Sequence, residues 1–353
     1  MEQAVGLPED LPGIVGAWAV GAISAAAEPA AGTVNRTVLL TTARGRFVLR
    51  AYRHRDREPV DREHAIIHFV AAEGVPAVAP RPLPGGGTVL ERDGRYFALF
   101  PWAPGRQVAR ADVGEAEATA MGAALARLHL VLRGYPRAGL PRRGGVPDRA
   151  DTLARLARLE GVIRAGAAGD PLAAAALERL AGQRAYLERL PASPAGGAAP
   201  RATQPEQALH GDYQEANLFF AGGRVSAIID WDQPGLAPPA WEVVRTLQLV
   251  FDYDPGRCRS FLRAYRTVRP LPLVDLDAAV AVRDVLAAHG LWVLETLYLA
   301  GDRRVARFLR GPDAGPFVPV AERWARARAL CAPDRAPPAA ATRRAGENPV
   351  SSA

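Results

Sequence analysis

The chain contains no lysine, because all 44 of its Lys and Arg residues are arginines. A nucleotide-binding loop of the Gly-Lys-Ser/Thr type is therefore excluded, and so is any reaction through a lysine Schiff base. The arginines are spread along the chain and mixed with Asp and Glu, as on a solvated surface. Together with abundant Ala, Gly and Pro, this pattern indicates a GC-rich coding bias. The formal net charge of +7 therefore does not predict a nucleic-acid partner.

Cysteine and long apolar runs are also scarce. The 2 cysteines, Cys258 and Cys331, are too few for a disulfide framework, and we expect a cytoplasmic location. No apolar run is long enough to span a membrane, and residues 1–13 do not have the layout of a signal peptide. We therefore expect no membrane partner. A chain of 353 residues, 49% of them hydrophobic, is long enough for two lobes with substantial cores.

The most informative stretch is residues 209–231, LHGDYQEANLFFAGGRVSAIIDW. Asp212, in the triplet that begins with His210, precedes Asn217 by five residues, and Asp230 follows Asn217 by thirteen. Phosphoryl transfer requires one carboxylate near the attacking hydroxyl, and a second carboxylate with an amide oxygen to hold magnesium. This stretch supplies all three groups.

Two short strands are predicted within this stretch, at residues 218–220 and 225–229, with 221–224 as the turn between them. Asn217 then lies at the entry of the first strand and Asp230 at the exit of the second. We therefore expect these two side chains to be close in space.

The spacing H-G-D-x-x-x-x-N followed by I-D-W resembles the motif of the aminoglycoside phosphotransferases, choline kinases and type II homoserine kinases, which share the fold of protein kinases. The resemblance is strongest over residues 205–245 and extends more weakly from 33 to 299. It implies Mg²⁺-dependent transfer of the γ-phosphoryl group of ATP or GTP to a hydroxyl of a small molecule. An aminoglycoside, an amino alcohol, homoserine and a sugar all remain open as acceptors.

Each motif residue has an expected role. Asp212 accepts the proton of the acceptor hydroxyl or orients that hydroxyl, while Asn217 and Asp230 bind Mg²⁺ through oxygen atoms. By resemblance, His210 braces the loop. Taken singly, each of these residues is open to a simpler interpretation as a polar side chain of a turn.

The absence of lysine changes the expected nucleotide site. Arg50 stands where the resembling families carry a lysine, and it can bind two phosphate oxygens at once. Glu63, in a predicted helix, is its expected partner. Phe100 and Trp102 are expected to line the adenine slot, although packing in the core is an equal alternative for both.

These patterns predict an α+β protein with a two-lobed, protein kinase-like fold. An N-terminal lobe, residues 1–102, contains a small antiparallel sheet and one helix and binds the nucleotide. A larger, mainly helical C-terminal lobe, residues 103–331, carries the catalytic loop and the acceptor site. Residues 332–353, rich in Ala, Pro and Arg, are expected to be a disordered tail.

Two further hypotheses stay open. The lost lysine is compatible with a catalytically silent nucleotide-binding module, and His210, Asp212 and Asp230 could serve a metal-dependent hydrolase. A transition-metal site is poorly supplied, because the chain has 6 histidines and no second one near the motif. The roles of Asp232 and Glu242 are also open: Glu242 stands where the resembling families carry an Asp that anchors the loop, and its side chain is one methylene longer.

Overall fold

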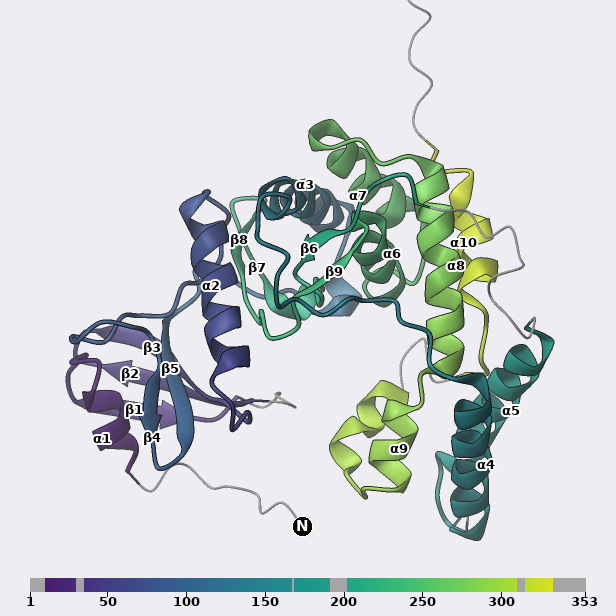
Figure 1. Cartoon of the computed structure of the whole chain (residues 1–353), viewed down its shortest axis with the longest axis horizontal. Helices are drawn as coiled ribbons and strands as arrows, with labels where there is room; N and C mark the ends of the chain where they lie inside the picture. Colours follow the sequence, from purple (N-terminus) through teal and green to yellow (C-terminus); the bar gives the residue numbers. More distant parts are fainter. Residues whose placement is uncertain (1–9, 30–34, 167, 191–201, 310–314, 333–353) are drawn as a thin grey trace, which may run out of the picture.

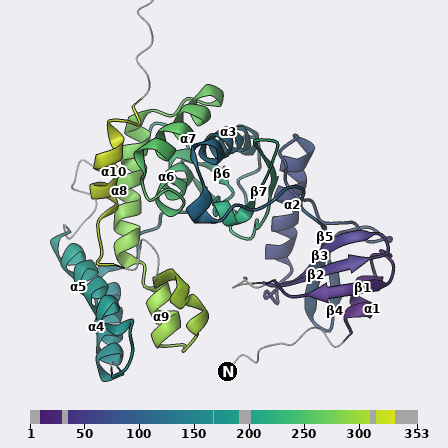
Figure 2. The same ribbon diagram turned by 180° about the vertical axis from the view of Figure 1, so that it is seen from behind.

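The computed structural model describes residues 10–29, 35–166, 168–190, 202–309 and 315–332. The predicted tail therefore lies, apart from its first residue, outside the described residues. The chain forms two lobes, a β-sheet lobe and a larger helical lobe, on either side of one long helix, α2 (Figures 1 and 2). The predicted α+β, two-lobed arrangement is present.

The N-terminal lobe is built on one antiparallel sheet, with the strand order β1-β2-β3-β5-β4. The strands are β1 (Ile23–Ala27), β2 (Arg36–Thr42), β3 (Gly45–Ala51), β4 (Leu90–Arg92) and β5 (Arg95–Pro101). The predicted hairpins at 33–52 and 88–100 correspond to β2–β3 and β4–β5. β1 was not predicted, because its sequence Ile-Ser-Ala-Ala-Ala has only one β-branched residue and no aromatic residue, and such residues favour strands.

Alternation along the strands gives the sheet two different faces. Val38, Leu40 and Leu49 are buried on one face, where they pack with the short helix α1 (Leu11–Gly16). This helix corrects the prediction of a single helix in the lobe; six residues are too few to give a helical period. The other face carries Arg50, which contacts the helical lobe.

Helix α2 (Glu58–Ala72) follows the predicted helix at 59–73. Pro59 stands in its first turn together with the acidic Glu58 and Asp61, and Gly74, with φ +76°, ends the helical path. Its buried face includes Glu63 and thereby places a carboxylate beneath the sheet.

His64, also on α2, is buried, and each of its ring nitrogens has a hydroxyl partner. Its Nε2 lies 2.9 Å from the Tyr52 hydroxyl and its Nδ1 lies 2.6 Å from Thr88 Oγ1. Burial lowers the pKa of His64 from 6.5 to about 4. Between pH 6.5 and pH 4 this histidine is therefore protonated more readily in the unfolded chain than in the folded lobe. The folded lobe loses stability as the pH falls through this range.

We therefore expect the free energy of unfolding to drop by about 2–3 kcal/mol between pH 6.5 and pH 4 through His64 alone. His64→Gln should remove this part of the pH dependence, whereas His68→Gln, at an exposed position on the same helix, should retain most of it, because burial is the larger cause of the shift. Urea unfolding at several pH values measures both. Equal pH dependence in the two variants would contradict the assignment.

The helical lobe is organised around α3 and α7, which pack closely. A Cβ atom at Gly122 of α3 would lie 2.1 Å from the carbonyl oxygen of Phe261, so only glycine permits this approach. The helices are α3 (Glu115–Leu132), α4 (Arg149–Ala165), α5 (Ala173–Arg189), α6 (Pro239–Leu249), α7 (Pro255–Val268), α8 (Leu273–His289), α9 (Trp292–Tyr298) and α10 (Val320–Arg328). Within the described ranges, none of the helices combines the length and apolar character needed to cross a bilayer.

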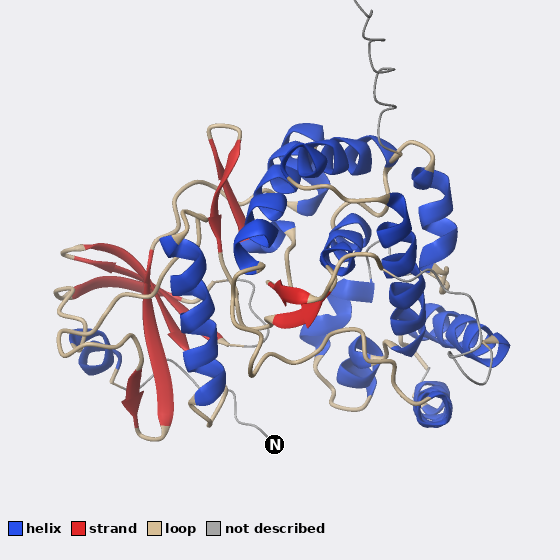
Figure 3. Cartoon of the chain, turned by 45° about the horizontal axis from the view of Figure 1, so that its top comes forward, coloured by secondary structure: helices blue, strands red, loops and turns tan. Residues whose placement is uncertain are grey.

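Two small ribbons interrupt the helical lobe and hold the motif (Figure 3). β7 (Leu218–Ala221) and β8 (Arg224–Ile228) form the predicted hairpin, and its two turn glycines, Gly222 and Gly223, both have positive φ. β6 (Gln207–Leu209) pairs with β9 (Gly235–Ala237) and brackets the loop that contains Asp212.

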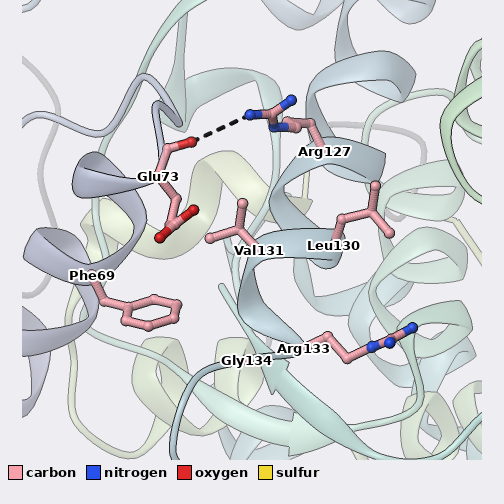
Figure 4. A pocket seen from close by; sticks show the side chains of 7 residues that line it. All are labelled: Phe69, Glu73, Arg127, Leu130, Val131, Arg133 and Gly134. Carbon is pink, nitrogen blue, oxygen red and sulfur yellow. Dashed lines mark hydrogen bonds between the residues drawn. The ribbon is translucent and has the colours of Figure 1, made fainter.

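A hollow with a volume of about 600 Å³ lies between the last turn of α2 and the C-terminal half of α3 (Figure 4). Within it, Arg127 Nη2 donates a hydrogen bond of 3.4 Å to the backbone oxygen of Glu73. No predicted site residue lines this hollow. The site is instead defined by the contacts around the motif.

Candidate active site

Asp212 lies in the loop between β6 and β7 and is held on three sides. Its Oδ2 accepts hydrogen bonds from Gln214 Nε2 at 2.8 Å and Asn217 Nδ2 at 2.9 Å, and its Oδ1 pairs with Arg245 Nη2 at 2.6 Å. Burial alone would raise the pKa of Asp212, but the Arg245 cation and these hydrogen bonds outweigh burial and lower it. The carboxylate is therefore ionised at neutral pH and can accept a hydrogen bond from a hydroxyl.

Asn217 and Asp230 are brought together as the hairpin predicts. The backbone nitrogen of Ile229 donates to the oxygen of Asn217 at 3.0 Å, which ties the two ends of the hairpin. The Asn217 side chain donates through Nδ2 to both the backbone and the carboxylate of Asp212. Both bonds use the amide nitrogen of Asn217. Neither uses its side-chain oxygen, which is the atom that a magnesium ion would bind.

Asp230 adopts a left-handed backbone conformation, with φ +64°. Such a conformation is uncommon for a residue with a side chain and occurs often at functional sites. Here it lies two residues beyond the end of β8, and the carboxylate, 34% exposed, pairs with Arg50 across the two lobes. Asn217 and Asp230 could offer two oxygen ligands, a number that would suit an ion held mainly by nucleotide phosphates.

Arg50 forms the centre of an ion-pair network between the lobes. Its Nη1 lies 2.6 Å from Glu63 Oε1, and its Nη2 contacts Asp230 Oδ1. Burial would lower the pKa of Arg50, but the two carboxylates outweigh burial and raise it, so the guanidinium stays charged. Burial raises the pKa of Glu63 to about 7, although Arg50 opposes this shift. The expected Arg50–Glu63 pair is present.

The two aromatic residues expected at the adenine slot differ in their surroundings. Trp102 lies at a hollow of about 200 Å³ on the open face of the sheet, and the Arg46 guanidinium stacks 3.5 Å from the centre of its ring. Phe100 packs edge-on against His64, within an apolar cluster of the N-terminal lobe, and it also contacts the main core of the helical lobe. Trp102 thus borders a hollow over strands β1 and β2, whereas Phe100 packs in the core.

His210 is engaged through both ring nitrogens. Its Nδ1 accepts a hydrogen bond from the backbone nitrogen of Asp212 at 3.2 Å, and its Nε2 lies 3.1 Å from the carbonyl oxygen of Ile229. The ring also packs on Trp231, with centres 4.4 Å apart. This arrangement requires a neutral ring with its proton on Nε2, and it fits a bracing role.

Glu242 anchors the same loop from α6. Its Oε1 accepts a hydrogen bond of 2.5 Å from the backbone nitrogen of Gly211, and its Oε2 lies 2.9 Å from His129 Nε2. His129 Nδ1 in turn lies 2.8 Å from the Tyr265 hydroxyl. Burial would raise the pKa of Glu242, but these partners outweigh it and lower the pKa. The extra methylene is therefore accommodated in a fully buried chain of hydrogen bonds.

Asp232 also belongs to the site. Burial and then the negative charge of Asp230 raise its pKa to about 6, while Arg50 opposes the shift. Asp232 is therefore a third carboxylate within electrostatic reach of Asp212 and Asp230. Its place could not be read from the sequence, because Asp232 lies four residues beyond the end of β8, where a chain can turn in several directions.

Sequence reasoning missed Arg245, which pairs with the motif carboxylate. Arg245 follows Glu242 by three residues, one turn of α6, and this spacing places both side chains toward the loop. This helical spacing from Glu242 was the one feature of the sequence that could have predicted the place of Arg245. Among the described residues, no group of three or more His, Cys, Asp or Glu side chains is placed to hold a metal ion.

The fold and this site define a small-molecule kinase, an enzyme that transfers a phosphoryl group to a hydroxyl. Residues 26–274 match the family described as the phosphotransferase enzyme family, and the chain belongs to that family.

Curated relatives include two homoserine kinases. The chain is 28% identical over 266 residues to the homoserine kinase of Brucella anthropi, a match that covers 73% of this chain and 75% of that one. It is 28% identical over 288 residues to the homoserine kinase of Gluconacetobacter diazotrophicus, with 78% and 83% covered.

Two solved structures share the fold. Spectinomycin phosphotransferase APH(9)-Ia, in complex with ADP and spectinomycin, matches with a TM-score of 0.64 at 13% identity, over 93% of this chain and 100% of that one. The amicoumacin kinase hAmiN, in complex with AMP-PNP, Ca²⁺ and Ami, matches with a TM-score of 0.59 at 17% identity, over 91% and 93%.

Proposed function

We propose that this protein transfers the γ-phosphoryl group of ATP or GTP, with Mg²⁺, to a hydroxyl of a small acceptor. The observation that carries the proposal is the position of Arg50 between Glu63 and Asp230. A kinase site needs a cation on the sheet, paired with a helix carboxylate and facing the metal-binding carboxylate. Here an arginine fills that position. The nucleotide complexes among the structural relatives support the same proposal.

In this proposal the nucleotide lies between the sheet and the motif hairpin. Arg50 binds phosphate oxygens through its two Nη atoms, and Trp102 lies beside the base. Arg50 would hold the phosphates and Asp230 a magnesium ion, which would supply positive charge against those phosphates. Asn217, already oriented by Asp212, contributes its amide oxygen. The N-terminal lobe, residues 1–102, thus carries the nucleotide side of the site.

The acceptor hydroxyl is positioned by Asp212. Phosphoryl transfer passes through a loose transition state, so positioning and charge stabilisation matter more than strong base catalysis. The low pKa of Asp212 fits this role, because the carboxylate stays ionised and accepts the hydroxyl hydrogen bond. His210 and Glu242 hold the backbone of the loop, from its two sides, in the geometry that the transfer requires.

The proposal is tested by measuring nucleotide consumption over a panel of aminoglycosides, amino alcohols, homoserine and sugars, with ATP and with GTP. We expect at least one acceptor to be phosphorylated and chelation of Mg²⁺ by EDTA to stop the reaction. Tight binding of Mg-nucleotide without a phosphorylated acceptor would instead favour the silent module. Phosphate release without a phosphorylated acceptor would favour a hydrolase.

Replacing Asp230 by asparagine should weaken Mg-nucleotide binding and lower turnover together, each by about 10–100-fold, because a charged ligand to the metal is lost. Calorimetric titration of MgATP and steady-state kinetics measure the two effects. Asp252→Asn is a matched control, since Asp252 also has positive φ and pairs with an arginine, Arg323, but is not part of the motif. Wild-type binding by the Asp230 variant would remove it from the metal site.

A further inference from the structure

Three N–H donors beside the catalytic loop are buried and make no hydrogen bond with any described residue. They are Trp241 Nε1, Arg245 Nη1 and Arg143 Nε. Trp241 and Arg245 are one turn apart on the same face of α6. A Cβ atom at Gly144 would lie 3.9 Å from Trp241 Nε1, so the loop that carries Arg143 passes over this face. Burying a donor without a partner is unfavourable, and a cluster of such donors indicates a binding site for an acceptor group.

The cluster adjoins the proposed reaction centre. Arg245 uses its other terminal nitrogen, Nη2, for the ion pair with Asp212, and Arg143 Nη2 donates to the backbone oxygen of Gln233. A Cβ atom at Gly211 would lie 3.3 Å from Arg143 Nη2, which places this guanidinium against the catalytic loop. Both arginines thus contact the catalytic loop or its Asp212 through one nitrogen and keep another buried donor without a partner.

Carboxylates and guanidinium groups both lie around this cluster, and two of the carboxylates already have partners. The negative side chains that act on Arg143 are Glu242, Asp232 and Asp212. Glu242 is already bound to Gly211 and His129, and Asp212 to Arg245. Burial and then the Arg245 cation lower the pKa of Arg143, so the two guanidinium groups repel each other. An anion that contacted both arginines would remove this repulsion and give the free donors a partner.

We propose that Arg143, Arg245 and Trp241 form a subsite for a carboxylate carried by the acceptor, a few bonds from the hydroxyl that Asp212 orients. This inference rests on the proposed function, since it names the acceptor class of the same site. A planar carboxylate matches a guanidinium, whose donors lie in one plane. Trp241 is 9% exposed, and its ring contributes one further N–H donor. Arg143 is only partly buried, so rotation of its side chain admits the ligand.

The subsite predicts which acceptors are rejected. A polycation such as an aminoglycoside would place positive charge against two arginines, which is unfavourable at short range. A short hydroxy acid presents both required groups in one small molecule, a hydroxyl for Asp212 and a carboxylate for the arginines. The acceptor is therefore expected to be a hydroxylated carboxylic acid.

Two pairs of acceptors test the subsite on the full chain. In the pair 4-hydroxybutanoate and 1,4-butanediol, and in the pair L-homoserine and 3-aminopropan-1-ol, the reacting hydroxyl is kept and the carboxylate is lost. We expect the carboxylated member of at least one pair to have a KM about 10–100-fold lower, the effect of charge-assisted hydrogen bonds. Kanamycin should not be phosphorylated.

Matched variants assign the effect to this cluster. Arg143→Gln should raise KM for the carboxylated acceptor toward that of its neutral counterpart and leave kcat and the nucleotide KM unchanged. Arg142→Gln is the control, because Arg142 is the neighbouring arginine, is 74% exposed and pairs with Glu206. Trp241→Phe removes one N–H donor and should raise the same KM by a smaller factor. Thermal unfolding of each variant verifies that it is folded.

The outcomes separate this inference from the proposed function. Equal KM values within both pairs, equal effects of Arg143→Gln on both members, or a wild-type-like Arg143→Gln would overturn the carboxylate subsite. Phosphorylation of kanamycin would do the same while upholding kinase activity. If no acceptor is turned over, the proposed function fails, and calorimetric titration of 4-hydroxybutanoate decides the subsite. Binding that Arg143→Gln abolishes supports it, and lack of binding to the wild-type chain overturns it.

Discussion

Replacing Asp212 by alanine is expected to lower kcat by roughly 10²–10⁴-fold, the usual contribution of a positioned acid–base group. The nucleotide KM should change little, because the residues that face the nucleotide are Arg50 and Asp230 rather than Asp212. Asp212 holds the acceptor hydroxyl in this proposal, and its carboxylate is ionised by the pairing with Arg245. Single-turnover and steady-state kinetics with one accepted acceptor measure the effect.

The structure adds a second variant to this test. Alanine at position 212 also removes the acceptor of the Asn217 and Gln214 hydrogen bonds, so the loop itself could rearrange. Asp212→Asn keeps an oxygen acceptor but loses the negative charge, and it should be nearly as inactive as the alanine variant.

Asp302→Ala is the control for loss of an Asp–Arg pair, since Asp302 pairs with Arg304 outside the motif. It should retain wild-type kinetics. If Asp212→Ala kept more than about half of the wild-type kcat, the assignment of Asp212 would be wrong.

The motif hairpin could be predicted from the sequence because its signals are local. Alternating apolar residues and two adjacent glycines specify two short strands and a tight turn, and these alone bring Asn217 and Asp230 together. The pairing of Arg50 with Glu63 needed one further step, the packing of α2 beneath the sheet. The resemblance supplied that step, whereas periodicity alone did not.

The residues that sequence reasoning missed lie on elements that only tertiary packing brings to the site. Arg143 is on a loop about seventy residues before Asp212, and its position depends on the pairing of that loop with β9. Arg245 and Trp241 lie on the correct face of α6, but nothing local shows that this face meets the catalytic loop. Glu242 was in doubt because of its length, and only the distance to Gly211 resolves the question.

The arginine that replaces lysine on β3 provides the last test. Arg50 makes two contacts at once, with a helix carboxylate in its own lobe and with Asp230 of the other. A lysine has one ammonium group and would have to share it between the same partners. The fork of the guanidinium therefore fixes the two lobes relative to each other more firmly than an ammonium would.

Arg50→Ala should lower kcat/KM for the nucleotide by about 10²–10⁴-fold, because two charge-assisted hydrogen bonds of about 1.5–3 kcal/mol each are lost. Arg50→Lys should retain substantial activity, since an ammonium reaches the same phosphate oxygens as a point charge. Arg92→Ala, at a half-buried strand residue that pairs with Asp10, is the matched control in the same sheet.

A loss of folding must be kept apart from a loss of phosphate binding. Without Arg50, Glu63 is a buried carboxylate without its partner, and its pKa, already about 7, would rise further because the charge that opposes burial is gone. The double variant Arg50→Ala, Glu63→Gln removes that buried charge and should recover thermal stability but not nucleotide kcat/KM. If stability and kinetics recovered together, Arg50 would serve the fold and not the phosphates. Wild-type kinetics in Arg50→Ala would refute both roles, because the site would then bind its nucleotide without any cation on the sheet.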